Sequence, residues 1–265
     1  MFPHNGRLTL DGGTADYICF GKGEKTLVMI PGIGDGMKTV KGMALPFAPL
    51  YRKLGKKFRV YVFSRRNELP EHFSTRDMAR DLSAAMEMLG LKSACVIGIS
   101  QGGMIAQWLA ANHPDKVDKL VLAVTLCRQN DTVRDAIGSW CEMARKDDYR
   151  GIMMDIADRS YTPERAKKEK RTFALMGNIG KPSDFSRFLI QAESCLTHDS
   201  SDVLKDIRIP TLVIGGTEDR IVTGKASEEI AEGIGGCELY LYEGLSHGLY
   251  EEAPDFMERV AAFFG

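Results

Sequence analysis

The sequence predicts an α/β protein with a mostly parallel sheet, helices on both faces of that sheet, and one helical insertion. Short apolar runs of strand length alternate with segments whose apolar residues recur at helical spacing. This alternation stops between residues 128 and 206, where only helical spacing is found. We therefore predict a sheet-based core from residues 1–127 and 207–265, with residues 128–206 forming a helical cap, or lid, over one edge of the sheet.

The first part of the chain predicts strands separated by turns. Residues 7–10 and 15–20 flank Asp11-Gly12-Gly13, which is typical of a hairpin. Continuous apolar runs further along are typical of strands that are buried on both faces. These strands are predicted at residues 26–30, 58–63, 94–97 and 117–124, with helices at residues 75–89 and 104–111.

The insertion is predicted to contain four helices. Apolar stripes that include Trp140 and Met153 indicate the first two. Thr162-Pro163-Glu164 indicates the start of a third, because proline is favoured at the first helical position. Ser183 is placed to cap a fourth. After the insertion, strands are predicted at residues 209–214 and 238–242, and helices at residues 225–231 and 254–264.

Composition and charge exclude several classes of function. The formal net charge is −1, which gives no sign of a nucleic-acid or membrane-surface partner. The longest fully apolar stretch, residues 120–124, is too short to span a bilayer. The polar start of the chain lacks an apolar signal core, and the six cysteines are widely spaced. These features predict a cytoplasmic protein with reduced thiols.

Cofactor and metal motifs are also missing from the sequence. The five histidines are scattered, and no Cys-x-x-Cys spacing occurs. Gly32-Ile33-Gly34-Asp35-Gly36 does not have the spacing of a dinucleotide-binding loop, and no phosphate-binding loop of the Walker type is found. We therefore expect neither a metal nor a cofactor.

Two segments match the Gly-x-Ser-x-Gly pattern of a nucleophile elbow, a sharp turn that presents a serine between a strand and a helix. Gly98-Ile99-Ser100-Gln101-Gly102 follows a predicted buried strand and precedes a predicted helix. Gly244-Leu245-Ser246-His247-Gly248 follows a strand, but no helix signal comes before Pro254. Because the elbow needs both neighbours, Ser100 is the predicted nucleophile and Ser246 is not.

The segment from Gly98 to Gly103, together with Ala106-Gln107, resembles the capped α/β-hydrolases, which include small esterases, lactonases and carbon–carbon bond hydrolases. The resemblance covers nearly the whole chain, although the insertion matches only in being helical. It implies that His247 is the general base, because the family's catalytic histidine occupies the loop between the last strand and the last helix. His198, at the end of the insertion, is the rival candidate.

A histidine base needs a carboxylate that fixes its tautomer and stabilises its charged form. The Gly-x-x-Asp segment that ends at Asp219 follows a predicted strand and resembles the acid loop of the same family. Adjacent Glu218 is the alternative. Aspartate loses less rotamer freedom when it is fixed, and only one of two neighbours on a tight loop can reach the histidine. Asp219 is therefore the predicted acid.

The negative oxygen that forms during acyl transfer needs two N–H donors held in place. One predicted donor is the backbone N–H of Gln101. The other comes from the glycine-rich loop that begins at Pro31, with Ile33 predicted and Gly34 as the alternative. Many relatives have His-Gly-x-Gly here, whereas this chain has Pro31 in the histidine's position. It also has Phe63-Ser64-Arg65-Arg66-Asn67 where relatives often carry Asp-x-Arg-Gly, so Arg65 takes the arginine's position but the glycine is missing.

These residues together predict a serine hydrolase that cleaves a small ester, thioester or lactone through an acyl-enzyme intermediate. Gly34 and the insertion residues Trp140, Met153 and Phe188 are the predicted walls of an apolar-leaning pocket. One alternative is a carbon–carbon bond hydrolase with the same triad, and another is a non-catalytic receptor on the same fold. A dehalogenase or epoxide hydrolase would have aspartate in place of Ser100. The sequence predicts a small acyl substrate as the partner and no particular oligomeric state.

Overall fold

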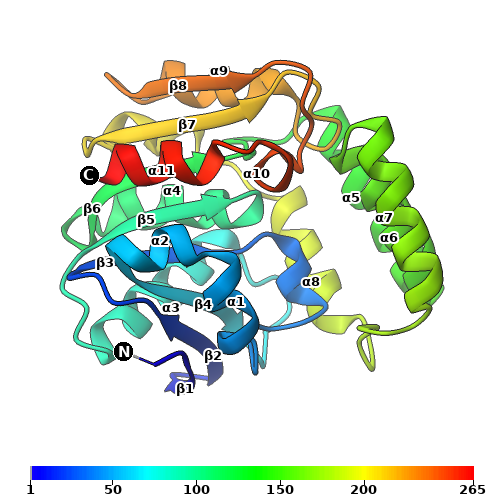
Figure 1. The fold of residues 1–265 in the computed structure, drawn as a ribbon, viewed down its shortest axis with the longest axis horizontal. Coiled ribbons are helices and arrows are strands. Elements are labelled where there is room, and N and C mark those ends of the chain that lie inside the picture. The colour runs from blue at the N-terminus through cyan, green and yellow to red at the C-terminus, as the bar shows by residue number, and fades with distance from the viewer. Residues whose placement is uncertain (1) are drawn as a thin grey trace.

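The computed structural model, which describes residues 2–265, has an eight-stranded sheet in the order β1-β2-β4-β3-β5-β6-β7-β8 (Figure 1). The pairs β1–β2 and β2–β4 are antiparallel, and the remaining neighbours are parallel. The strands are β1 (His4–Leu10), β2 (Gly13–Phe20), β3 (Lys25–Ile30), β4 (Phe58–Arg66), β5 (Ala94–Ile99), β6 (Val117–Ala123), β7 (Thr211–Gly216) and β8 (Glu238–Tyr242). The predicted fold class is confirmed.

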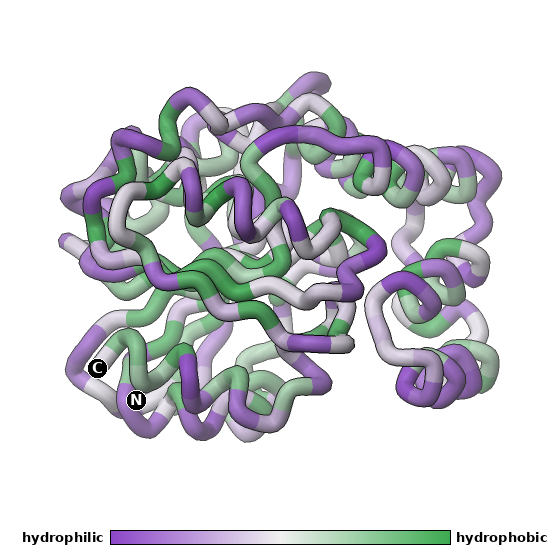
Figure 2. Tube along the Cα trace, turned by 90° about the horizontal axis from the view of Figure 1, so that it is seen from above, coloured by the Kyte–Doolittle hydropathy of each residue, from purple (hydrophilic) through white to green (hydrophobic). Residues whose placement is uncertain are grey.

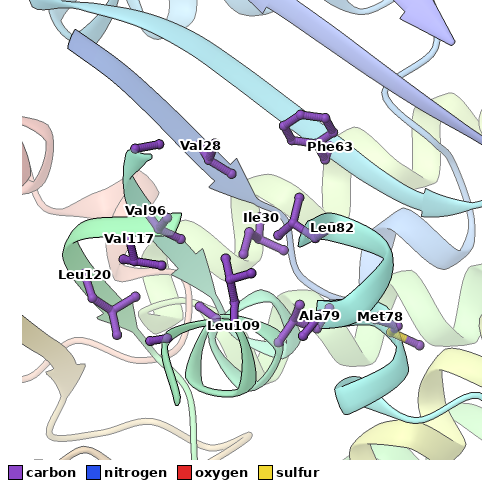
Figure 3. Packing of buried hydrophobic residues seen from close by; sticks show 14 of the residues in the cluster. Val28, Ile30, Phe63, Met78, Ala79, Leu82, Val96, Leu109, Val117 and Leu120 are labelled. Carbon is purple, nitrogen blue, oxygen red and sulfur yellow. The ribbon is translucent and has the colours of Figure 1, made fainter. Parts of the chain in front are cut away.

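Helices cover both faces of this sheet. On one face lie α3 (Thr75–Met88), α4 (Gln101–Asn112) and α9 (Gly224–Gly233), and on the other α1 (Ala44–Leu50), α2 (Arg52–Lys57) and α11 (Phe256–Phe264). Figure 3 shows the first face, where Leu82 of α3 and Leu109 of α4 pack against Ile30 and neighbouring strand residues. Apolar positions therefore gather in the middle of the molecule, as Figure 2 also shows.

Helix α3 illustrates how local sequence sets an element's bounds. Ser74 precedes it and forms a capping box with Asp77, in which each side chain binds the other residue's backbone N–H. The helix ends before Gly90, whose φ of +68° favours glycine. Its apolar stripe is buried against the sheet, as the helical spacing predicts.

Four helices lie between β6 and β7: α5 (Asp131–Arg145), α6 (Tyr149–Ser160), α7 (Pro163–Met176) and α8 (Ser186–Leu196). In Figure 1, α5, α6 and α7 stand beyond the arrowhead of β7, at one end of the sheet. An apolar cluster joins α5, α6 and α8 to core residues such as Ile33 and Met104. The capping prediction for Ser183 is wrong, because α8 begins only at Ser186, whose backbone N–H binds Asp184 instead.

Several short helices were not predicted from the sequence. These are α1, α2, the four-residue α10 (Leu249–Glu252), and the short 3₁₀ turns η1 (Ile33–Gly36), η2 (Pro114–Lys116) and η3 (Ser201–Asp206). Helix α1 contains Pro46 and Pro49, which ordinarily disfavour a helix, and seven residues are too few to give a clear apolar period. Such short helices depend on packing against the sheet rather than on their own propensity.

No disulfide joins any of the six cysteines within the part of the chain that the structure describes, and five of these side chains are buried. Burial raises the pKa of the Cys195 thiol to about 12, so this group stays protonated at neutral pH. Among residues 2–265, no helix has the length and apolar character needed to cross a membrane.

Candidate active site

The predicted catalytic and oxyanion-hole residues lie on or directly after four loops that leave the sheet at one edge. Residues 31–36 follow β3, Ser100 follows β5, Asp219 follows β7 and His247 follows β8. Because β3, β5, β6, β7 and β8 are parallel, their carboxyl ends meet at the same edge. Open parallel sheets place their ligand sites at this edge.

Ser100 forms the turn between β5 and α4 in a left-handed backbone conformation, with φ of 55° and ψ of −122°. Non-glycine residues seldom adopt such a φ, and the surrounding glycines explain how the turn is accommodated. An ideal β-carbon on Gly98 would lie 2.4 Å from the Gly102 carbonyl oxygen, and one on Gly102 would lie 2.0 Å from the Ile30 carbonyl oxygen. The turn is therefore possible only because strand and helix approach without side chains between them.

Ser100 and His247 both line one cavity. The backbone of Ser100 is held by its N–H, which donates to Ala123 at 2.9 Å, and by its carbonyl oxygen, which accepts from Thr125 at 2.8 Å. Within residues 2–265 the hydroxyl itself forms no hydrogen bond to a protein group. Catalytic hydrogen bonds are often long in a ligand-free site and shorten when substrate binds.

Ser246, in the second Gly-x-Ser-x-Gly segment, has a different environment. Its side chain is buried, and its hydroxyl donates to the Arg159 carbonyl oxygen at 2.6 Å and accepts from the Arg220 N–H at 3.3 Å. Contrary to the sequence prediction, a helix does begin soon after this segment, at Leu249. Ser246 nevertheless lies on the loop and ties the insertion to the core, which is a structural arrangement.

His247 and Asp219 form a buried pair. The Nδ1 atom of His247 lies 2.9 Å from Oδ2 of Asp219, and the other carboxylate oxygen accepts the backbone N–H groups of Ile221 and Val222 at 2.8 and 2.9 Å. Burial by itself would raise the pKa of Asp219, but His247 and the two N–H donors lower it below its ordinary value. Glu218, the alternative acid, is exposed.

His198, the rival base, lies outside this cavity. Its ring is buried between the hydroxyls of Thr75 and Ser200, at 2.8 and 3.1 Å. Burial lowers the pKa of His198 to about 4, so the ring is neutral under ordinary conditions. This environment gives His198 a structural role at the join between the end of the insertion and α3.

The loop that follows β3 runs directly beside Ser100. An ideal β-carbon on Gly32 would lie 3.3 Å from the Ser100 β-carbon and 3.8 Å from its hydroxyl oxygen. Within residues 2–265, the backbone N–H groups of Ile33 and Gln101 donate to no protein acceptor. An oxyanion needs two N–H donors that are not already bonded to the protein, so both groups remain candidates for this role.

The cavity has a volume of about 540 Å³, which is in the range of small-molecule sites. Of the four residues predicted as pocket walls, Gly34, Trp140 and Met153 line this cavity and Phe188 does not. Phe188 is fully buried, and its α-carbon lies against Gly36 of η1, so it supports the loop from behind. The apolar wall also includes Met104, Val133, Ile137, Ile156, Phe173, Ile221 and Val222.

Charged groups complete the cavity lining. Lys38, Arg150 and Glu251 are exposed, and the hydroxyl of Tyr161 donates to Glu251 at 2.9 Å. In the described part of the chain, no group of three or more histidine, cysteine, aspartate or glutamate side chains is arranged to hold a metal ion.

Sequence reasoning missed a buried polar cluster beneath this loop. It consists of Asp35, Arg65, Arg187 and Gln191 together with the side chain of Gln101. Arg65, on β4, could be singled out because it follows the strand predicted at residues 58–63. Arg187 and Gln191 lie on α8 and carry no local signal that they reach the β3 loop.

Comparison with known proteins gives a consistent result. A family model described as the alpha/beta hydrolase fold matches residues 25–254. The serine hydrolase BPHL of Mus musculus is 25% identical over 275 residues, which cover 97% of this chain and 85% of that protein. The 3-oxoadipate enol-lactonase 2 of Acinetobacter baylyi is 21% identical over 263 residues, covering 99% and 97% of the two chains.

Solved structures agree with this fold. The enol-lactonase from Burkholderia xenovorans LB400 superposes with a TM-score of 0.82 and 23% identity, over 97% of this chain and 99% of that one. MGS-M2, an alpha/beta hydrolase enzyme from a deep-sea metagenome library, gives a TM-score of 0.86 and 22% identity, over 98% and 97%.

Proposed function

Because this chain belongs to the alpha/beta hydrolase fold family and is an enzyme of it, we propose that it is a serine hydrolase acting on a small ester, thioester or lactone. The observation that carries the proposal is the shared cavity of Ser100 and His247, with Asp219 bound to the far side of the imidazole. Its similarity to a serine hydrolase and to an enol-lactonase supports the same class of reaction.

The proposed reaction begins when His247 takes the hydroxyl proton of Ser100 and the oxygen attacks the substrate carbonyl carbon. Asp219 keeps the proton on Nδ1, so that Nε2 is the basic nitrogen, and stabilises the imidazolium that forms. The carbonyl oxygen becomes negative and accepts the N–H groups of Ile33 and Gln101. His247 then protonates the leaving alkoxide, thiolate or ring oxygen, and an acyl-enzyme remains on Ser100. Water, activated by the same imidazole, hydrolyses it.

We also propose that residues 128–206 act as a cap over this site, with the remaining residues as the core. Trp140 and Met153 of the cap and Gly34 of the core would contact the acyl or alcohol group. The mostly apolar wall favours an apolar group of moderate size, since the cavity has a volume of about 540 Å³.

The direct test is labelling with a fluorophosphonate, which bonds covalently to an activated serine. We expect stoichiometric labelling of Ser100, identified by peptide mass spectrometry, and hydrolysis of p-nitrophenyl esters at a rate well above background. Labelling without turnover of any ester, thioester or lactone would favour the carbon–carbon bond hydrolase. A chain that is not labelled would be the non-catalytic receptor.

The cavity wall makes a separate prediction about acyl length. Met153→Trp narrows the cavity, so kcat/KM for p-nitrophenyl octanoate should fall by roughly 10-fold or more, while the value for p-nitrophenyl acetate stays within about threefold. The matched control is Met154→Trp, because Met154 lines a different surface hollow, with residues of α7. An equal loss for both esters, or the same pattern in the control, would mean that the acyl group lies elsewhere.

A further inference from the structure

We propose that Arg65 is the positioning residue of the oxyanion hole. Arg187 of the insertion holds the loop that carries Ile33 in place by binding Asp35. The inference rests on the proposed function, because it assigns Ile33 and Gln101 as the donors to the oxyanion. It goes further by naming what holds these two donors at a fixed separation in a chain that has Pro31 where relatives have histidine.

Arg65 joins the two segments that carry the donors. One nitrogen of its guanidinium, Nη2, donates to the Pro31 carbonyl oxygen at 2.5 Å and to the Gln101 side-chain oxygen at 2.8 Å. Pro31 lies two residues before Ile33, and Gln101 is itself the second donor residue. A planar guanidinium presents its donors in a fixed geometry, so this contact sets the distance between the β3 loop and the start of α4.

Asp35 is the second fixed point of the loop. Its carboxylate accepts the backbone N–H of Arg65 at 3.1 Å and a guanidinium nitrogen of Arg187 at 2.6 Å. Arg187 also donates to the Asp35 carbonyl oxygen and, at 3.0 Å, to the Arg65 carbonyl oxygen. The η1 turn that contains Ile33 is thereby held between β4 and helix α8.

Gln101 has its own connection to α8. Its side-chain nitrogen donates to the Gln191 carbonyl oxygen at 2.8 Å and to the Ser194 hydroxyl at 3.0 Å. The amide of Gln101 thus bridges Arg65 on one side and α8 on the other. Because this side chain is fully buried, water cannot take the place of a hydrogen-bond partner that is lost.

The buried charges of Arg65, Asp35 and Arg187 are better explained by a role in the active site than by a contribution to folding stability. The side chains of Arg65 and Asp35 are almost completely buried, at 2% and 1% exposure. Burial lowers the pKa of Arg65 to about 10 although Asp35 raises it, so the guanidinium is still charged at neutral pH. Buried ion pairs contribute little net stability compared with apolar residues of the same volume. Two guanidiniums around one carboxylate also leave a net positive charge beside the place where the oxyanion forms.

The test compares Arg65→Met with Arg66→Met. Arg66 is the next residue on β4 and is also buried, but its guanidinium pairs with Asp81 of α3 and does not reach the β3 loop. For Arg65→Met, we expect kcat to fall by roughly 100-fold with KM within about twofold, because the loss falls on the transition state. Arg66→Met should keep kcat within about twofold of wild type.

Inhibitor binding separates this role from a general structural one. A trifluoromethyl ketone forms an oxyanion on the enzyme, so its Ki should rise in Arg65→Met by the same factor by which kcat/KM falls. Binding of the product alcohol, which makes no oxyanion, should be unchanged. If kcat stays at the control's value, or if ketone and alcohol weaken equally, Arg65 does not position the oxyanion hole.

Two milder variants serve if Arg65→Met does not fold. Gln101→Met removes the bridging amide but keeps the backbone N–H, and Arg187→Met removes a side chain that is 16% exposed. Each should lower kcat by roughly 10-fold and weaken the ketone equally. Wild-type activity together with wild-type ketone affinity in both variants would overturn the inference while leaving the proposed function intact. Failure of the wild-type chain to hydrolyse any ester would instead contradict the proposed function.

Discussion

Replacing Ser100 with alanine is expected to lower kcat by about four to six orders of magnitude, because the variant has no oxygen to form the acyl-enzyme. The fold should survive. The Ser100 hydroxyl has no protein hydrogen-bond partner among residues 2–265, and the two backbone contacts to Ala123 and Thr125 do not involve its side chain. Alanine also meets the same steric penalty as serine at a φ of 55°. Initial rates on p-nitrophenyl acetate and a thermal unfolding curve measure both expectations.

Ser246→Ala is the matched control, because it changes the serine of the other Gly-x-Ser-x-Gly segment. That hydroxyl holds Arg159 and Arg220 together, so its loss should cost about 1–2 kcal/mol of stability and leave kcat within roughly tenfold. A Ser100→Ala variant that keeps even a tenth of the wild-type rate would show that the nucleophile is another residue.

Asp219→Asn is expected to lower kcat by about four orders of magnitude, through the wrong tautomer of His247. Asparagine presents an N–H where the carboxylate accepted one, so Nδ1 of His247 would lose its proton and Nε2 would carry it instead. The proton acceptor that Ser100 needs would then be absent. The backbone N–H groups of Ile221 and Val222 can still donate to the asparagine side-chain oxygen, so the conformation of the loop should be unchanged.

Glu218→Gln is the control for this variant, since Glu218 is the adjacent residue and is exposed. Its rate should be nearly that of wild type. Both variants are compared by kcat on one activated ester, with circular dichroism to check the fold. If Glu218→Gln is the inactive one, or if both variants keep near-normal rates, Asp219 is not the acid.

The lowered pKa of Asp219 also makes the stability of the folded protein depend on pH. Its pKa in the folded state lies below the ordinary value, so the ionised carboxylate contributes stability at neutral pH. The contribution is present above the unfolded-state pKa and is lost as the pH falls through the folded one. Because asparagine does not titrate, the stability of Asp219→Asn should fall less than that of wild type as the pH is lowered through the pKa of Asp219.

The sequence alone determined the features that depend on neighbours along the chain. The turn at Ser100 could be recognised because Gly98, Gly102 and Gly103 stand within three residues of it, between an apolar run and a helical stripe. The same holds for Asp219 and His247, each of which follows a strand by a few residues. Parallel strands end at one edge, so residues that come directly after them are brought together by the fold class itself.

Only the tertiary structure decided which side chains face the cavity and which support it. Trp140 and Phe188 have similar places on amphipathic helices, yet Trp140 lines the cavity and Phe188 lies behind the η1 turn. Helical spacing identifies the buried side of a helix but not what that side packs against. Arg187 reaches Asp35 across 152 positions of sequence, and no local pattern records such a contact. Its partner is fixed by how α8 docks on the sheet edge, which depends on the packing of the whole insertion.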